Sequence, residues 1–453
     1  MRFESFDQML KHWAGERPEG PALRYEGRTV TFSGLEELVR SRADELRSSG
    51  KTCAAILAES TPECVIEIFA ANLAGMQVVM LDPSLSDELL ARLLPYSDAD
   101  SVWSSDPEFA EDLAPYLSAG LSRDGAGGHC GTDRILFFTS GTTSSSKAVV
   151  LTGRSLCSSA WNGSAKLPLT TDDTLLCVLP LAHVFGFVCG LLWGLSCGAC
   201  VALGTGPRGY VSDFGLYKPT AVSLVPLLLG FLLKNGAFNP ELRTLLIGAG
   251  DCPAELIGAA KSKGISVSFG YGLTETSSGV AISTSGDPYA MEICPDDRID
   301  IAEDGEILIT APTCMMQGYY KDPASTAEAL SGGVLKSGDL GYIGEDGRLR
   351  ITGRKKDVLA LPDGTKIFLP EYEAALAGPL AGSEFAVDLR DGRPVLIFCG
   401  DSPKEEIIKI IRPVMDELPR GQQITDVIFT PGPLPRTATG KLKRWEIRQK
   451  VGL

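Results

Sequence analysis

The sequence predicts an α/β protein: a large N-terminal body of sheets flanked by helices, which includes a small β-rich subdomain, followed by a small mobile α+β domain. Three observations lead to this prediction. The chain has 453 residues, more than one hydrophobic core usually serves. Short β-forming runs alternate with amphipathic helical patterns through about the first three hundred residues. After them, the pattern changes to short strands separated by Asp-Gly turns.

The first strand–helix unit of the alternation lies in residues 28–50. It is typical of a strand, a helix N-cap at Ser33 and an amphipathic helix that ends at Gly50. Residues 53–83 continue with a strand, a helix and a second strand. Units of this kind favour a sheet with helices on its faces.

The same alternation returns between residues 174 and 272, where Gly or Pro ends the strands and helices. Two turns, Asp304-Gly305 and Asp346-Gly347, then punctuate short strands and predict the β-rich subdomain. We find no internal repeat and no long low-complexity segment.

From about Val358 the pattern predicts a separate α+β unit. It contains a charged hairpin, a helix, two alternating strands, a second helix and a proline-rich tail. We therefore predict an N-terminal core at residues 1–355 and a C-terminal lid domain at residues 356–453.

Composition excludes several classes of protein. The formal net charge of −15 disfavours binding to nucleic acids or anionic membranes, because both require a positive surface. The N-terminus has no signal-peptide pattern, and no stretch approaches the roughly 20 apolar residues that span a bilayer. Twelve cysteines lie scattered in apolar runs, as free thiols do in a reducing compartment. We therefore expect a cytoplasmic protein.

The stretch "FFTSGTTSSSKAVVLT", residues 137–152, supplies hydroxyls and backbone N–H groups before a lone lysine, Lys147. Such a loop suits phosphate oxygens. It departs from the Walker pattern, because Ser146 precedes the lysine and Ala148 follows it. Taken alone, the stretch is equally compatible with a solvated Ser/Thr linker.

This stretch resembles the phosphate loop of the adenylate-forming superfamily, which includes acyl- and aryl-CoA synthetases and amino-acid adenylation domains. Further segments are similar to motifs of that family and occur in the same order, so that the resemblance covers essentially the whole chain. They are residues 61–86, 179–187, 269–277, 335–357 and 434–447.

The resemblance implies ATP and Mg²⁺ as cofactors and a role for each matching residue. The residues expected to bind the β- and γ-phosphates are Thr139, Ser140, Gly141, Thr142, Thr143 and Lys147. Those expected around adenine and the nucleotide are Gly248, Ala249, Gly250, Gly270, Tyr271 and Gly272, with Tyr271 stacked on the base. Asp339 is expected to accept the ribose hydroxyls, with Arg354 as a neighbouring ribose or phosphate partner.

Three residues are implied in catalysis. Glu275 would hold Mg²⁺, Thr274 would touch the α-phosphate, and Lys441 would bridge the α-phosphate and the attacking carboxylate. A carboxylate is already ionised at pH 7, so its attack needs neutralisation of charge on pyrophosphate rather than a general base. A pantetheine thiol, of CoA or an acyl-carrier protein, would then attack the acyl adenylate after the C-terminal domain turns about the hinge Lys356.

The acyl pocket is expected to involve His183, Gly186, Ser277, Ser278 and Gly279. The segment "AHVFGF" lacks the Asp that amino-acid-activating members usually carry, which favours an uncharged acyl or aryl acid. The segment following Arg354 is more similar to fatty-acyl ligases, so we expect a fatty or related acyl group. The short chain also suits an o-succinylbenzoate-CoA or aryl-CoA ligase, and this alternative stays open.

Some features leave other interpretations open. Ser144, Ser146 and Ala148 stand where the family usually has Gly, Pro and Gly, which is compatible with a weakened, nucleotide-binding family member. Glu275 and Asp339 could be caps of helices or turns, and His183 a core histidine. Four basic residues could be no more than a solvated basic surface without a functional role: Lys355, Lys356, Lys443 and Arg444.

Overall fold

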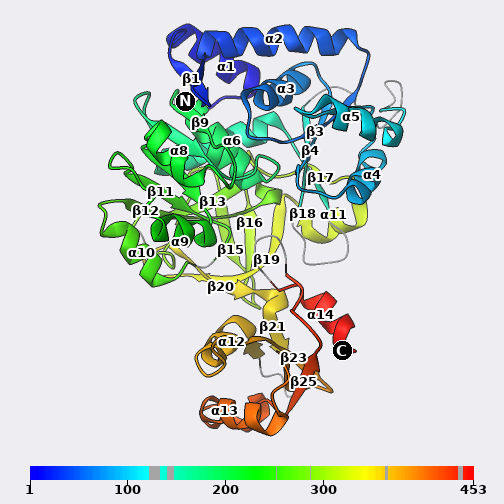
Figure 1. Cartoon of the computed structure of the whole chain (residues 1–453), viewed down its shortest axis with the longest axis vertical. Coiled ribbons are helices and arrows are strands. Elements are labelled where there is room, and N and C mark those ends of the chain that lie inside the picture. Colours follow the sequence, from blue (N-terminus) through cyan, green and yellow to red (C-terminus); the bar gives the residue numbers. More distant parts are fainter. Residues whose placement is uncertain (122–132, 140–146, 251, 286, 363–365, 437–441) are drawn as a thin grey trace.

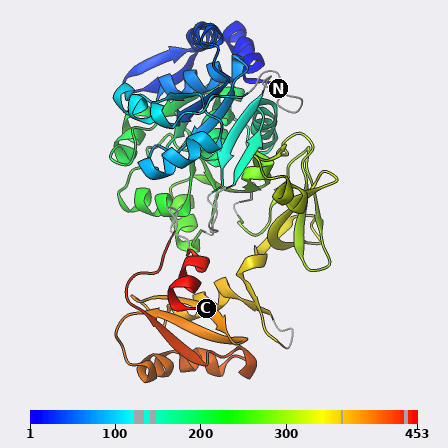
Figure 2. The same cartoon turned by 90° about the vertical axis from the view of Figure 1, so that its right-hand side faces the viewer.

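The computed structural model describes residues 1–121, 133–139, 147–250, 252–285, 287–362, 366–436 and 442–453. A large body contains three sheets, and a smaller body at one end of the long axis follows it in the chain (Figure 1). The view turned by 90° shows the same separation (Figure 2). The predicted α/β class is confirmed.

The first sheet of the large body has six strands in the order β17-β7-β6-β4-β3-β5. β5, β3, β4 and β6 run parallel to one another, whereas β7 is antiparallel to β6. Every residue of β3 and β4 is buried, as expected for strands covered on both faces. The strands are β3 (Cys53–Leu57), β4 (Gln77–Leu81), β5 (Ser101–Trp103), β6 (Arg134–Phe138), β7 (Ala148–Leu151) and β17 (Gly318–Tyr319).

The second sheet has nine strands in the order β14-β13-β12-β11-β10-β8-β9-β1-β2, with a parallel centre and antiparallel edges. Its strands are β1 (Pro21–Tyr25), β2 (Arg28–Thr31), β8 (Thr174–Cys177), β9 (Cys200–Leu203), β10 (Ala221–Leu224), β11 (Thr244–Ile247), β12 (Ser266–Leu273), β13 (Ser278–Ser283) and β14 (Glu292–Ile293).

Helices flank these two sheets. They are α1 (Phe6–Glu16), α2 (Phe32–Ser48), α3 (Pro62–Leu73), α4 (Asp87–Tyr96), α5 (Pro107–Leu113), α6 (Gly153–Lys166), α7 (Trp193–Ser196), α8 (Tyr210–Tyr217), α9 (Pro226–Lys234) and α10 (Ala254–Lys261). A π-helix, Gly186–Leu192, leads directly into α7. One continuous hydrophobic core packs α1, α2, α3 and α6 against strands of both sheets.

The predicted N-cap of α2 is wrong by two residues. The helix begins at Phe32, and Thr31 caps it by accepting a hydrogen bond from Gly34 N. Ser33 instead donates its hydroxyl to Pro18 O at 2.8 Å. Phe32, at the first position of the helix, is almost completely buried, so its packing sets the start of the helix.

The third sheet is the predicted β-rich subdomain. Its strands are β15 (Arg298–Ile301), β16 (Glu306–Thr310), β18 (Leu330–Ser331), β19 (Val334–Ile343) and β20 (Leu349–Arg354), and α11 (Pro323–Ala329) precedes β18. Both predicted turns are present, because Gly305 and Gly347 adopt φ of 89° and 72° and join antiparallel strands.

The smaller body has hydrophobic clusters of its own, which begin at Leu359. It contains the predicted hairpin and alternates strands with helices: β21 (Val358–Ala360), β22 (Lys366–Phe368), α12 (Leu369–Ala377), β23 (Glu384–Arg390), β24 (Arg393–Cys399), α13 (Lys404–Asp416), β25 (Asp426–Thr430) and α14 (Arg444–Val451). In both views α14 lies at the side that faces the large body (Figures 1 and 2).

Arg444 does not belong to a solvated basic face. Its side chain is only 17% exposed and forms an ion pair with Glu373 at 2.8 Å. Lys443 pairs with Glu446 at 2.8 Å. Among the residues that the structure describes, no helix is long and apolar enough to cross a membrane.

Asp100 joins the beginning of β5 to the beginning of β3 at the edge of the six-stranded sheet, and its substitution tests the fold. Its buried carboxylate accepts three hydrogen bonds, from the N–H and hydroxyl of Thr52 and from Cys53 N, at 2.9 to 3.0 Å. We expect Asp100→Ala to destabilise the large body by about 2–3 kcal/mol, because these buried donors lose their acceptor.

Thermal unfolding followed by tryptophan fluorescence will measure this loss. The control, Asp112→Ala, removes an exposed carboxylate of α5 and should change stability by less than about 0.5 kcal/mol. Equal midpoints for the two variants would contradict the role of Asp100.

Candidate active site

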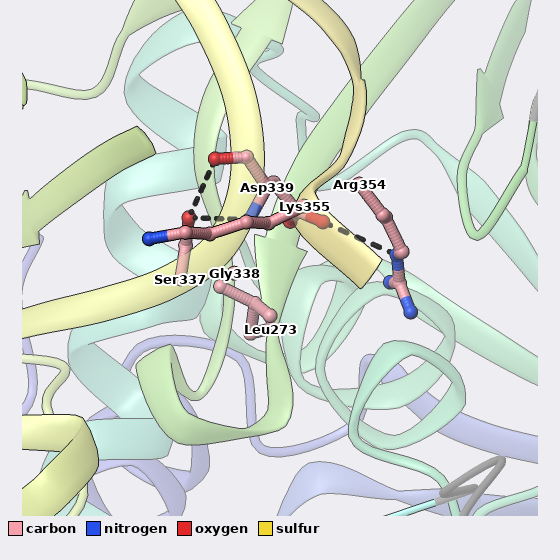
Figure 3. Close-up of a pocket in the computed structure, with 6 residues that line it drawn as sticks. All are labelled: Leu273, Ser337, Gly338, Asp339, Arg354 and Lys355. Carbon is pink, nitrogen blue, oxygen red and sulfur yellow. Dashed lines mark hydrogen bonds and ion pairs between the residues drawn. The ribbon is translucent and has the colours of Figure 1, made fainter. Parts of the chain in front are cut away.

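A cavity of about 410 Å³ lies where the end of β12 meets the third sheet (Figure 3). Its lining is formed by Leu273, Ser337, Gly338, Asp339, Arg354 and Lys355. These residues come from three separate stretches of the chain, β12, β19 and the end of β20 with the turn after it. The cavity therefore depends on how the second and third sheets pack.

Asp339 is the central acidic group of this cavity. Its side chain is buried, accepts a hydrogen bond from Tyr271 Oη at 2.9 Å, and lies 3.1 Å from Arg354 Nε. Arg354 is its cross-strand neighbour on β20. Burial, and then the nearby carboxylate, raise the pKa of the Tyr271 phenol, so the hydroxyl stays a donor. The structure thus brings together three residues that sequence reasoning assigned to one nucleotide.

Lys355 lies on the rim of the cavity and is held by two carboxylates. Its Nζ is 2.7 Å from Asp304 and 2.9 Å from Glu306, and hydrogen bonds to these groups raise the pKa of the lysine. Lys355 is therefore not a solvated cation without a partner. It ties the turn after β20 to the β15–β16 turn.

The turn Thr274–Thr276 follows β12 directly and presents Glu275. Glu275 Oε1 accepts a hydrogen bond from Tyr319 Oη at 2.7 Å, and its backbone oxygen accepts one from Met316 N at 2.8 Å. Within the described ranges, Oε2 accepts no hydrogen bond. The carboxylate is thus oriented with one oxygen available, an arrangement that fits a hard cation such as Mg²⁺.

Gly272 sets the spacing between Tyr271 and this turn. The pairing of β12 with β13 shifts register between Tyr271 and Gly272, and a Cβ on Gly272 would lie 1.6 Å from Ser278 O. Only glycine permits that approach. Gly270, one residue before Tyr271, pairs with Ile282.

The base of the predicted phosphate loop is closed by two hydrogen bonds. Thr139 N donates to Lys147 O at 2.9 Å, and Lys147 N donates to Thr139 Oγ1 at 3.2 Å. Lys147 Nζ lies 4.5 Å from the centre of the Tyr319 ring. The other predicted phosphate ligands, Ser140, Gly141, Thr142 and Thr143, lie outside the described residues, as do Ser144, Ser146 and the catalytic candidate Lys441.

The predicted acyl-pocket residues have distinct environments. Ser277 is fully buried, and its hydroxyl donates to Cys314 O at 2.7 Å. Ser278 Oγ lies 3.5 Å from Cys189 Sγ of the π-helix. Gly279 is partly exposed on β13, two residues after Ser277. Gly186 begins the π-helix, where a Cβ would lie 2.2 Å from Pro180 O.

His183 is not a core histidine, because its side chain is 43% exposed, and its Nε2 lies 3.6 Å from Asp82 Oδ2. Gly248 is buried after β11 against the Phe185 ring, whereas Ala249 and Gly250 are exposed. Ala249 has a left-handed φ of 64°. Lys356 lies in the turn Lys355–Asp357 between β20 and β21.

Tyr319 is the residue of this site that sequence reasoning missed. Its segment, "MQGYY", looks like an ordinary short strand, and nothing in its spacing places it near Glu275. The pairing of β17 with β7 places Tyr319 beside Val149, and hydrogen bonds from Met316 N and Tyr319 Oη join its segment to Glu275.

An α/β fold that carries these polar groups is typical of a nucleotide-binding protein. A sequence model described as "AMP-binding enzyme" matches residues 10–122 and 134–320. The chain belongs to the AMP-binding enzyme family, and its predicted membership in the adenylate-forming superfamily is confirmed.

Similar proteins span the whole chain. A 2-succinylbenzoate–CoA ligase of Bacillus cereus is 29% identical, with 99% of each chain covered. The o-succinylbenzoate coenzyme A synthetase of Bacillus subtilis in complex with AMP has a TM-score of 0.81 at 24% identity, covering 97% of this chain and 98% of that one; this likeness shows the fold. The same synthetase in complex with ATP and magnesium ion has a TM-score of 0.78 at 25% identity, covering 97% and 99%.

Asp339 allows a direct test of the cavity. We expect Asp339→Ala to weaken AMP binding by roughly 10- to 100-fold, because AMP would lose one or two hydrogen bonds to a charged acceptor. The loss should be much smaller for 2′,3′-dideoxy-AMP, because that ligand lacks the ribose hydroxyls. Isothermal titration calorimetry with both nucleotides checks this difference.

Asp304→Ala is the matched control, because it removes a neighbouring carboxylate outside the cavity lining. Asp339→Asn keeps the shape of the side chain and guards against misfolding of the alanine variant. An unchanged preference for AMP over the dideoxy nucleotide in both Asp339 variants would contradict the assignment.

Proposed function

We propose that the protein is an ATP-dependent acid–CoA ligase, which forms an acyl adenylate with release of pyrophosphate and then transfers the acyl group to a thiol. One observation carries the proposal. A single strand and its following turn, β12 to Thr276, hold Tyr271 beside Asp339 and Arg354 and, four residues later, present Glu275 beside Tyr319 and near Lys147. The proposed ribose acceptor and the groups proposed to neutralise the phosphates are thereby set at a fixed spacing.

For the first step, Asp339 would accept the ribose hydroxyls while Arg354 and Tyr271 hold its carboxylate in place. Glu275 would hold Mg²⁺, which neutralises charge on the departing pyrophosphate when bound. Lys147 and Lys441 would add positive charge around the phosphates. No general base is required, because the attacking carboxylate is already ionised.

We propose further that residues 1–355 and 356–453 act as two domains joined at Lys356. The separate hydrophobic clusters on either side of the turn Lys355–Asp357 support this division. At the junction, Gly353 has a φ of 149°, and a Cβ there would overlap the ring of Phe368. Rotation at Lys356 would carry Lys441 away from the phosphates before the thiol attacks.

We propose an acid resembling 2-succinylbenzoate as the substrate, because relatives of that name align with 99% of this chain. A fatty acid is the second candidate, favoured by the sequence of the segment after Arg354. CoA is the proposed acceptor, and the pantetheine of an acyl-carrier protein is the alternative.

Exchange of labelled pyrophosphate into ATP tests the first half-reaction. We expect exchange to depend on added 2-succinylbenzoate and to exceed the exchange supported by fatty acids, simple aryl acids or amino acids. Exchange with a fatty acid alone would select the second candidate. Folded protein that binds ATP but supports no exchange with any acid would fit the weakened family member and sink the ligase proposal.

Lys441 provides a test of the two-step mechanism. We expect Lys441→Ala to slow adenylation by at least the order of 10²-fold, about 2.7 kcal/mol of transition-state stabilisation. Thioester formation from preformed acyl adenylate should change much less. Lys443→Ala, which removes a lysine already paired with Glu446, serves as the control. Equal losses in both half-reactions would contradict the turning of the C-terminal domain.

A further inference from the structure

Tyr319 lies between two charged groups that come from different sheets. Its hydroxyl donates to Glu275 Oε1 at 2.7 Å, and the ammonium of Lys147 lies over its ring, 4.5 Å from the centre. Burial, and then the Glu275 carboxylate, raise the pKa of the Tyr319 phenol. The phenol hydroxyl is the donor of this hydrogen bond, because a carboxylate can only accept one. The same side chain therefore orients an anion through its hydroxyl and a cation through its ring face.

The fold holds Tyr319 firmly in this place. It is the last residue of β17 and pairs with Val149 of β7, two residues after Lys147. Its backbone N–H donates to Thr326 Oγ1 at 2.9 Å. Gly318, with a φ of 145°, allows the close approach of Thr326, because a Cβ there would lie 2.8 Å from that side chain.

Glu275 is tied to the same short segment a second time. Met316, three residues before Tyr319, donates its N–H to Glu275 O at 2.8 Å. The segment thus holds the backbone of Glu275 through Met316 and its carboxylate through Tyr319. Oε1 accepts the hydrogen bond from the phenol, and among the residues that the structure describes Oε2 accepts none, which leaves Oε2 available to a cation.

We propose that Tyr319 is a positioning residue for the metal–nucleotide complex: it sets the orientation of Glu275 toward a divalent cation and supports Lys147 at the phosphates. The identity of the ligand, ATP with Mg²⁺, rests on the proposed function. Tyr319 acts through Glu275 and Lys147 and is not placed against the reacting atoms.

Tyr320 offers a closely matched comparison. It is the next residue, its hydroxyl donates to a carboxylate of Asp98 at 2.6 Å, and burial raises the pKa of its phenol as well. Its ring packs in the cluster that includes Leu81 and Val150, not against Glu275 or Lys147. Tyr320→Phe therefore removes a similar hydrogen bond outside the metal–nucleotide site.

The experiment measures ATP binding to the full chain by calorimetry, once in excess Mg²⁺ and once in excess EDTA, without a carboxylic acid. For Tyr319→Phe we expect the gain in ATP affinity conferred by Mg²⁺ to fall roughly tenfold, the worth of a hydrogen bond to a charged group. Affinity in EDTA should stay within about twofold, because the ring under Lys147 is kept. Tyr319→Leu should weaken ATP binding in both conditions, and Tyr320→Phe in neither.

The outcomes separate this inference from the proposed function. If Tyr319→Phe keeps the full Mg²⁺ enhancement, or if the unaltered protein shows none, the role of Tyr319 is overturned. If the enhancement falls as expected while the unaltered protein supports no pyrophosphate exchange with any acid, the positioning role stands and the ligase proposal fails.

Discussion

The hydrogen bond from Tyr271 to Asp339 joins the nine-stranded sheet to the β-rich sheet at a buried point, and the candidate site is built around it. A buried carboxylate is costly unless it is paired and hydrogen-bonded. Here Arg354 supplies the charge and Tyr271 the additional donor. Because both partners come from structural strands, the two sheets must pack in this register for the acid to be satisfied.

All three sheets of the large body contribute to the site. The six-stranded sheet provides Lys147 and Tyr319, the nine-stranded sheet provides Tyr271 and Glu275, and the β-rich sheet provides Asp339 and Arg354. The bulge at Gly272 fixes the spacing on the middle strand. The candidate site therefore depends on how these layers pack against one another.

Sequence reasoning predicted what local patterns encode. The alternation of strands and helices, the two Asp-Gly turns and the motif residues Tyr271, Asp339 and Arg354 all follow from spacing or from resemblance, and the structure brings those three side chains together. It misplaced the start of α2, because the burial of Phe32 outweighs the capping preference of Ser33. It also missed Tyr319, because the pairing of β17 with β7 joins residues about 170 positions apart in the chain. No local pattern records such a long-range pairing.

The hydrophobic clusters of the two bodies share no residues. Two parts of a protein unfold cooperatively when the loss of one part of a core destabilises the other. Here the two bodies are coupled mainly through the short connection around Lys356. The chain is therefore better described by two stabilities than by one, as multi-domain proteins commonly are. A nucleotide bound among the three sheets would protect the large body by mass action and leave the melting of the smaller body nearly unchanged.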